Sequence, residues 1–289
     1  MPRSDQTSLS CLGDSLKYSP STHQSTLTKS RRLCFLGLSV VVTGKGGTGK
    51  TAIVALIVRA LMEKTDKAIL AIDADPNSNL NQVLGVPLRK TVGDIREQLL
   101  DEKEKFPPEM SKESYLEFMV QSSMTEGSRF DLLAMGRPEG PGCYCYVNTL
   151  LRRIVDTISG NYAFVVMDAE AGLEHLSRRT TKDVDIMLVA TDPTMRSMET
   201  ARRILELSKE LKTNVRHVYV VANRVPDSLR DTVRRSVESL GLDCIAVVPE
   251  DPAIQEYDMA GKPLMALPDT SPSYRAINEM MRKMPLKTN

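Results

Sequence analysis

A glycine-rich run near the start of the chain has the residue types and spacing that bind phosphate. It fits the pattern of a glycine, four further residues and then Gly-Lys-Ser/Thr, and reads Gly44-Lys45-Gly46-Gly47-Thr48-Gly49-Lys50-Thr51. Glycines let the backbone curl so that its N–H groups point inward at phosphate oxygens. In such a loop Lys50 reaches the β- and γ-phosphates of a nucleotide, and the Thr51 hydroxyl binds Mg²⁺. The run therefore predicts a phosphate-binding loop for a nucleoside triphosphate with Mg²⁺.

The phosphate-binding loop holds a second lysine, Lys45, directly after its first glycine. An ammonium group at this place neutralises charge either on the same nucleotide or on the nucleotide of a partner chain. The chemistry of the loop alone does not separate these two roles. Both of them make Lys45 a candidate catalytic residue beside Lys50.

Carboxylates follow two other apolar runs of the sequence. Asp73 and Asp75 stand where a carboxylate can order a water molecule or a hydrated Mg²⁺, and helix capping with a turn is the alternative. Asp168 can hold the hydration shell of Mg²⁺, and a solvated aspartate at a strand end is its alternative. Gly172 follows four residues later and can swing towards a γ-phosphate.

Two further polar residues are candidates for the same site. Asn223 follows the apolar run Val218–Ala222, and its side-chain amide can read the edge of adenine with both a donor and an acceptor. His175 lies three residues after Gly172 and can lend a metal ligand or shuttle a proton. A surface histidine at the start of a helix is the interpretation that we favour for His175.

Cys143 and Cys145 are separated by one residue, so both thiols point the same way on an extended backbone. A closed thiolate site needs four ligands, and two copies of the pair across a two-fold axis supply them. Such a site in a homodimer suits Zn²⁺ or Ni²⁺. Two buried small side chains, a redox dithiol and a bridging Fe–S ligand set remain as alternatives.

The elements that must position these residues are strands and helices in alternation. Apolar runs of strand length are expected at Leu36–Thr43, Ala68–Asp73, Phe130–Met135, Ala163–Asp168, Ile186–Thr191, Val218–Ala222 and Cys244–Val248. Helices are expected at Lys50–Lys64, Thr91–Lys103, Ser111–Ser122, Tyr146–Ser159, Met195–Leu211, Asp227–Leu240 and Ser273–Met284. The strand runs lack strict alternation, which is typical of strands covered on both faces. The pattern predicts a single α/β P-loop NTPase domain over residues 33–289, with a mostly parallel sheet and helices on both faces.

Composition limits the possible partners and compartment. The 289 residues carry a net charge of +1, and aromatic residues make up 4% with no Trp, so we expect no nucleic-acid partner. Five cysteines are too few for a disulfide scaffold and favour a cytoplasmic location. Residues 1–32 are rich in Ser and Thr and predict a disordered extension, with an organelle transit peptide as the weaker alternative. No run reaches the length of about 18 apolar residues that spans a bilayer. The C-terminal helix has a narrow apolar face, so we expect it to dock on the sheet and not on a membrane.

The phosphate-binding loop resembles the deviant Walker A motif of the MinD/ParA/nitrogenase-iron-protein class. In that class the extra lysine, here Lys45, reaches the phosphates of the other subunit of a homodimer. The stretch Asp73–Asn79 resembles its first switch, which implies that Asp75 positions the attacking water with Asp73 in support. Asp168-Ala169-Glu170-Ala171-Gly172 resembles its second switch. The class reads adenine with an asparagine at the place of Asn223, and the loop at Pro249 looks like the second wall of that base pocket.

The segment Gly136–Arg152, which contains both cysteines, resembles the CooC type of carbon monoxide dehydrogenase accessory protein. The resemblance covers residues 36–285 and implies a homodimeric ATPase that binds nickel or zinc through Cys143 and Cys145. Its client would be carbon monoxide dehydrogenase, and its cofactors ATP, Mg²⁺ and Ni²⁺ or Zn²⁺. An Fe–S-bridged reductase or carrier like the nitrogenase iron protein is the first alternative. A ParA/MinD-like positioning ATPase, which binds DNA or membrane, is the second.

Overall fold

The computed structural model describes residues 37–101, 109–137, 145–169, 183–210 and 214–286. The predicted extension over residues 1–32 lies outside these ranges, as do Cys143, Gly172 and His175. Within the described part, no helix is both long enough and apolar enough to cross a membrane.

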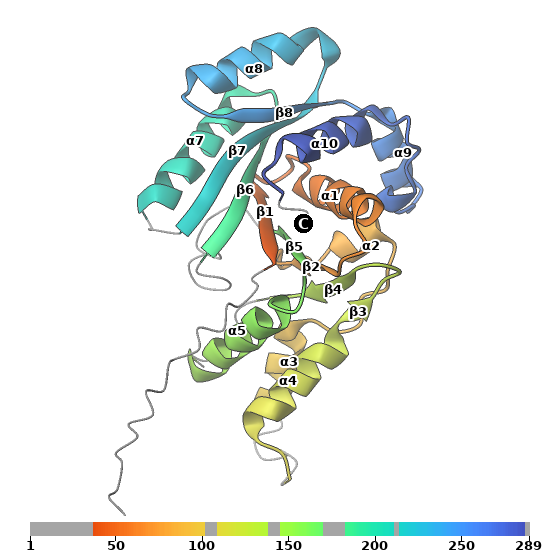
Figure 1. Cartoon of the computed structure of the whole chain (residues 1–289), viewed down its shortest axis with the longest axis vertical. Helices are drawn as coiled ribbons and strands as arrows, with labels where there is room; N and C mark the ends of the chain where they lie inside the picture. The colour runs from red at the N-terminus through yellow and green to blue at the C-terminus, as the bar shows by residue number, and fades with distance from the viewer. Residues whose placement is uncertain (1–36, 102–108, 138–144, 170–182, 211–213, 287–289) are drawn as a thin grey trace, which may run out of the picture. The chain divides into compact units, whose positions relative to one another are not determined.

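One eight-stranded sheet organises the chain, in the order β3-β4-β2-β5-β1-β6-β7-β8 (Figure 1). Its strands are β1 (Leu38–Gly44), β2 (Ile69–Asp73), β3 (Thr125–Glu126), β4 (Asp131–Ala134), β5 (Phe164–Asp168), β6 (Asp183–Thr191), β7 (Asn214–Val225) and β8 (Cys244–Pro249). Every neighbouring pair is parallel except β3 with β4, which is antiparallel. The parallel strands end at one edge of the sheet, where ligands of such sheets bind.

Helices cover both faces of the sheet (Figure 1). They are α1 (Lys50–Lys64), α2 (Leu80–Leu84), α3 (Val92–Asp101), α4 (Lys112–Ser123), α5 (Cys145–Ser159), α7 (Met195–Glu210), α8 (Arg230–Ser239), α9 (Pro252–Met259) and α10 (Pro272–Lys283), with short 3₁₀ turns at Asp227–Leu229 and Leu264–Ala266. Successive strand residues point to opposite faces, so Val40 and Val42 pack with α1 and α10 while Val41 packs with α3, α4 and α5. Two hydrophobic cores therefore pack on the two faces of β1 and fix the position of its carboxyl end.

The sequence predicted this architecture correctly, with α1 matching to the residue. The expected helix over Asp227–Leu240 is in fact a 3₁₀ turn followed by α8, and β7 is longer than the run Val218–Ala222 that marked it. The edge strand β3 and the helices α2 and α9 were not predicted.

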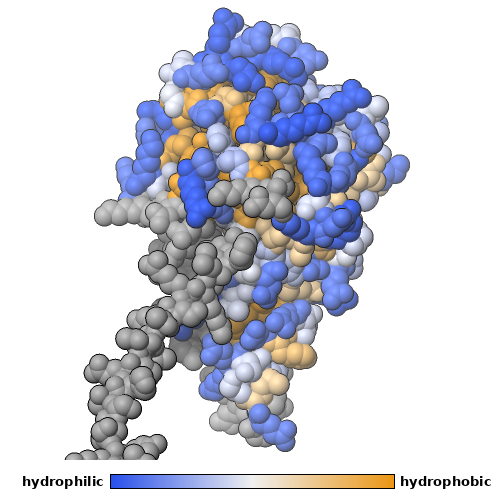
Figure 2. All heavy atoms as spheres, in the orientation of Figure 1, coloured by the Kyte–Doolittle hydropathy of each residue, from blue (hydrophilic) through white to orange (hydrophobic). Residues whose placement is uncertain are grey.

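The C-terminal helix α10 docks on the protein as expected. Ser271 caps it by accepting a hydrogen bond from the Tyr274 backbone N–H at 3.1 Å, and Pro272 occupies its first turn. Tyr274, Ile277 and Met281 are each at most 2% exposed and join the core of α1. The Arg59 guanidinium of α1 lies 3.9 Å from the centre of the Tyr274 ring. In Figure 2 hydrophilic side chains dominate the surface over α8, α9 and α10, and apolar side chains are visible in the region of β7.

Candidate functional site

The phosphate-binding loop joins β1 to α1, and its shape requires glycine. Gly44 has φ 144°, and a Cβ there would lie 2.2 Å from the Ala190 carbonyl oxygen of β6. Gly47 and Gly49 both have φ 81°, the left-handed region that other residues avoid. The loop therefore curls directly after β1 and delivers the N-terminus of α1 to the carboxyl edge of the sheet.

The two lysines of the loop lie in different environments. Lys50 is 8% exposed, and its ammonium donates a hydrogen bond to the Lys45 carbonyl at 3.3 Å. The Lys45 carbonyl also accepts a bond from the Thr48 hydroxyl at 2.8 Å. Lys45 itself is exposed at the surface of the loop. Lys50 is thus held within the loop, while Lys45 is accessible to a second molecule.

Asp73 lies at the end of β2 and is 1% exposed. Its two carboxylate oxygens accept hydrogen bonds from the backbone N–H groups of Asp75 at 3.1 Å and Leu80 at 2.9 Å. Burial raises the pKa of the Asp73 carboxyl to about 6, although both bonds favour its charged form. Asp73 therefore shapes the loop that carries Asp75, and its support of the attacking water stays a prediction.

Asp75 lies at the surface of this loop, in a turn built by its own groups. Its carboxylate accepts a hydrogen bond from the Asn77 N–H at 2.9 Å, and its carbonyl accepts one from the Ser78 N–H at 3.0 Å. Ser78 has φ 49°, so the turn ends in a left-handed residue. Part of the capping and turn alternative is therefore correct. The charge of the Asp75 carboxylate also contributes to raising the pKa values of Asp73 and Asp168.

Asp168 ends β5 next to β1 and is 1% exposed, so the solvated alternative for it is wrong. Burial, together with the charges of Asp73 and Asp75, raises its pKa to about 7. The Thr51 hydroxyl and the Lys50 ammonium oppose this rise. One carboxylate oxygen, Oδ1, has no hydrogen-bond partner among the described residues.

These groups fit a hydrated Mg²⁺. A buried carboxylate oxygen without a partner is costly, and a cation or its water supplies the missing partner. Among the described residues no group of three His, Cys, Asp or Glu side chains could hold a metal by itself. That is expected for Mg²⁺, which keeps several waters and takes the rest of its ligands from nucleotide phosphates. Thr51 and Asp168 are the residues that would hold it, and this role stays a prediction.

The residues predicted to contact the base lie at the ends of β7 and β8. Asn223 is 6% exposed, and its amide nitrogen donates to the Thr48 carbonyl at 2.8 Å. One of its donors is therefore engaged by the phosphate-binding loop, and its role towards adenine stays a prediction. The next residue, Arg224, donates to the Gly47 carbonyl at 3.0 Å. The sequence analysis missed Arg224, because nothing in the sequence marks an arginine after a strand as a loop contact.

The loop after β8 is held rigidly. The Pro249 carbonyl accepts a bond from the Ser273 hydroxyl at 3.1 Å, and the Glu250 N–H donates to the Val225 carbonyl at 3.1 Å. Asp251 caps α9 by accepting from the Ala253 N–H at 3.1 Å. Pro249 therefore sits on a fixed wall at the same edge as Asn223, and its contact with a base stays a prediction.

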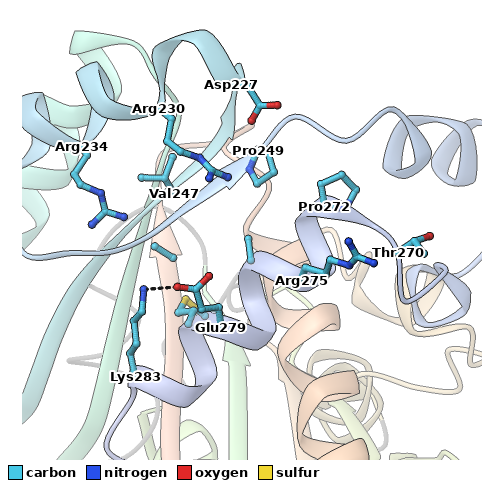
Figure 3. Close-up of a pocket in the computed structure, with 13 residues that line it drawn as sticks. Asp227, Arg230, Arg234, Val247, Pro249, Thr270, Pro272, Arg275, Glu279 and Lys283 are labelled. Carbon is cyan, nitrogen blue, oxygen red and sulfur yellow. Dashed lines mark ion pairs between the residues drawn. The ribbon is translucent and has the colours of Figure 1, made fainter.

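A cavity of about 490 Å³ lies at the outer edge of β8, between α8 and α10 (Figure 3). Its lining includes Arg230, Arg234, Arg275 and Lys283, with Asp227 and Glu279 as the acidic side chains. Lys283 pairs with Glu279 at 2.8 Å, and Arg230 and Arg234 contribute to lowering the pKa of that carboxyl. Pro249 lines one end of this cavity, and none of the other predicted site residues contributes to it.

Of the predicted metal-binding cysteines, Cys145 is the first residue of α5 and Cys143 lies outside the described residues. The helix α5 is anchored in the core by Leu151, Ile154 and Val155. The structure describes no contact of either thiol. The metal site at the cysteine pair therefore stays a prediction.

Comparisons with known proteins agree with this geometry. The sequence profile of the CobQ/CobB/MinD/ParA nucleotide-binding domain matches residues 39–264. The chain belongs to this family of P-loop ATPases. The MinD cell division protein of Aquifex aeolicus has a similar structure, with a TM-score of 0.63 and 25% identity over 87% of this chain and 100% of that one. A ParA family ATPase from Chlorobium tepidum shares the fold, with a TM-score of 0.64 at 20% identity.

Two relatives of this MinD/ParA-type ATPase narrow the family further. An uncharacterised ATP-binding protein of Methanocaldococcus jannaschii is 47% identical over 247 residues, covering 85% of this chain and 97% of its own length. The carbon monoxide dehydrogenase accessory protein CooC of Rhodospirillum rubrum is 31% identical over 255 residues, covering 82% and 92%. The resemblance to the CooC type is thereby confirmed at the level of the family.

Proposed function

We propose that this ATPase is a homodimeric, Mg-ATP-dependent metallochaperone that assists nickel insertion into carbon monoxide dehydrogenase. The observation that carries the proposal is the Cys143-x-Cys145 pair in a chain related to an accessory protein of that enzyme. The exposed Lys45 supports the dimer, because its ammonium is accessible to a nucleotide on another chain. The sparse cysteines support a cytoplasmic location, where thiolates stay reduced and able to bind metal.

In the proposed reaction water attacks the γ-phosphorus of ATP, the bond to the β–γ bridging oxygen breaks, and ADP and phosphate leave. Asp75 orders the attacking water. Lys50 and the partner copy's equivalent of Lys45 neutralise the charge that develops on the γ-phosphate. When bound, Mg²⁺ supplies positive charge to the phosphates, and Thr51 and Asp168 would hold it.

The proposed transport cycle links hydrolysis to the cysteines. Two Cys143/Cys145 pairs, one from each chain, hold one Ni²⁺ or Zn²⁺ while ATP keeps the dimer closed. The chain supports such a link, because α5 starts at Cys145 and leads through a short connection into β5, which ends at Asp168. Loss of the γ-phosphate releases the two switches, and the pairs separate so that the metal can leave.

A metal titration tests the proposal. The wild-type protein should bind about one Ni²⁺ or Zn²⁺ per dimer, and the Cys143→Ala/Cys145→Ala variant should bind none tightly. Cys244→Ala is the matched control, because that thiol is buried in β8 and should not affect binding. Tight metal binding that survives the double substitution would overturn the site.

The same preparation separates the alternatives. A brown chromophore in anaerobically purified protein would favour an Fe–S-bridged reductase or carrier over a nickel carrier. ATP-dependent binding to DNA or liposomes that survives loss of both cysteines would favour a positioning ATPase. Colourless protein that contains nickel or zinc and binds neither surface agrees with the metallochaperone.

A further inference from the structure

The strand β7 ends irregularly beside the phosphate-binding loop. Its pairing with β8 shifts register between Ala222 and Val225, which leaves Asn223 and Arg224 in a bulge. Arg224 has φ 55°, a left-handed conformation that is strained for an arginine. Such strained residues persist where the surrounding structure requires them, and they gather at functional sites.

The bulge brings two consecutive side chains to the same loop. In a regular strand Asn223 and Arg224 would point to opposite faces of the sheet. Here the Asn223 amide donates to the Thr48 carbonyl at 2.8 Å, and Arg224 Nη1 donates to the Gly47 carbonyl at 3.0 Å. Two neighbouring carbonyls of the phosphate-binding loop are therefore held by two neighbouring residues of β7.

Holding these carbonyls also fixes the amides that follow them. In a planar trans peptide the C=O of one residue and the N–H of the next point in opposite directions. Fixing the carbonyls of Gly47 and Thr48 towards β7 therefore turns the N–H groups of Thr48 and Gly49 away from it, and the Thr48 N–H donates to the Lys45 carbonyl within the loop at 3.4 Å. The Gly49 carbonyl is held as well, by the Ile53 N–H of α1 at 3.1 Å. These bonds restrict the backbone of the loop before any nucleotide binds.

The contact between β7 and the loop is close. A Cβ on Gly49 would lie 2.4 Å from the Asn223 amide nitrogen and 3.5 Å from Arg224 Nε. Glycine is therefore required at position 49 both by its φ of 81° and by the side chains packed over it. Both side chains lie close over the part of the loop that leads into Lys50.

We propose that Arg224 is a positioning residue of the ATPase, which preorganises the phosphate-binding loop through its hydrogen bond to Gly47. The bond from the guanidinium goes to a carbonyl of the loop, so the proposed effect of Arg224 acts through the loop. It improves nucleotide binding by fixing in advance the amides that receive the phosphates. The proposal rests on the ATPase activity alone and is independent of any metal carried at the cysteines.

Three substitutions test the role of Arg224. Arg224→Ala removes the hydrogen bond and keeps a side chain in the strained conformation. Arg224→Gly removes the bond and relieves the strain, while Arg224→Lys keeps the charge and one donor. We expect the first two to raise the Kd for Mg-ADP and the KM for ATP by about tenfold, which is typical of one lost charge-assisted hydrogen bond. Arg224→Lys should recover part of this loss, and kcat should change little because ground and transition states lose the same contact.

Thermal unfolding without nucleotide separates positioning from folding. The melting temperature of the ligand-free Arg224→Gly variant should stay close to that of the wild type. Arg216→Ala is the matched control, because that arginine lies near the other end of β7 and pairs with Asp185 at 2.7 Å. It should leave the Kd for Mg-ADP unchanged.

Several results would overturn the proposal. If Arg224→Gly binds Mg-ADP with the wild-type Kd, the hydrogen bond does not preorganise the phosphate-binding loop. This conclusion holds whatever Kd Arg224→Ala shows. A fall in kcat at unchanged KM would instead show that Arg224 stabilises the transition state. If the wild-type protein does not bind Mg-ADP, the proposed ATPase function itself is wrong. This result differs from the one that would overturn only the role of Arg224.

Discussion

The charge balance at the carboxyl edge of the sheet depends on protons as well as on a cation. Asp73 and Asp168 are both buried, with pKa values of about 6 and about 7, and Asp75 adds a third carboxylate beside them. In the absence of Mg²⁺, neutral pH leaves part of this cluster protonated. A bound cation then has to displace protons, so nucleotide with Mg²⁺ should bind more tightly as the pH rises through this range.

The first prediction concerns the stability of the metal-free protein. The pKa of Asp168 is raised on folding, so the folded state holds a proton that the unfolded state has lost between about pH 4 and 7. The free energy of unfolding should therefore fall as the pH rises through this window, by about 1 kcal/mol per unit from this group. Asp168→Asn should remove that part of the slope. Urea unfolding in EDTA at pH 5.5 and 7.5 measures how the free energy of unfolding changes with pH. An equal change in the wild type and in Asp168→Asn would contradict a raised pKa at Asp168.

For individual residues, the sequence predicted which side chains lie together at the site but not their protonation. The spacing of the glycines and the positions of Asp73 and Asp168 after apolar runs were sufficient to place them at one edge. The raised pKa of Asp168 was not predictable, because it depends on burial by strands far away in the sequence. Arg224 was missed for a related reason, since a bulge and a left-handed residue depend on the pairing of β7 with β8.

At the scale of elements, the region after β8 shows what local patterns miss. The sequence predicts a loop over Pro249-Glu250-Asp251, whereas Pro249 ends β8 and Asp251 is the N-cap of α9, which begins at Pro252. An aspartate directly before a proline was the available signal for a helix start. The strand β3 has two residues and carries no periodicity that a sequence could show. The long helices α1, α7 and α10 were predicted well because each covers several turns.

The second prediction concerns Asp251, whose side chain joins the starts of α9 and α10. Its carboxylate caps α9 through the Ala253 N–H, and it accepts bonds from the Ser271 hydroxyl and from the Ser273 N–H at 3.2 Å, both at the start of α10. Asp251→Ala leaves these donors unsatisfied at a buried site, so we expect a loss of about 2–4 kcal/mol in the free energy of unfolding. Chemical denaturation measures it.

Asp258→Ala is the control for that measurement, because Asp258 is an exposed residue of the same short helix. Its substitution should change the stability by less than about 0.5 kcal/mol. Equal losses in the two variants would show that the hydrogen bonds of the Asp251 side chain do not stabilise the protein.

At the scale of the whole molecule, the third prediction separates the two lysines of the loop. Lys50 is buried within the loop and Lys45 is exposed on it, so they should serve different steps. Lys50→Ala should abolish nucleotide binding. Lys45→Ala should bind Mg-ADP nearly as well as the wild type but should neither dimerise with a non-hydrolysable ATP analogue nor hydrolyse ATP at a normal rate. Light scattering coupled to gel filtration measures the dimer, and a fully dimeric Lys45→Ala protein would show that this lysine acts within its own chain.

The fourth prediction follows from the proposed connection between nucleotide and metal. The helix α5 begins at Cys145, is fixed in the core by Leu151 and Val155, and leads through a short connection into β5, which ends at Asp168, so it connects the proposed metal site with the proposed nucleotide site. If closure by an ATP analogue tightens the binding of Ni²⁺ by some factor, about tenfold being typical, then Ni²⁺ must tighten the binding of the analogue by the same factor. Calorimetric titrations of each ligand in the presence and absence of the other measure both factors. The coupling should vanish in Cys143→Ala/Cys145→Ala and persist in Cys244→Ala. If Ni²⁺ does not change the affinity of the wild-type dimer for the ATP analogue, the two proposed sites are not coupled. ATP binding would then not control the proposed metal binding.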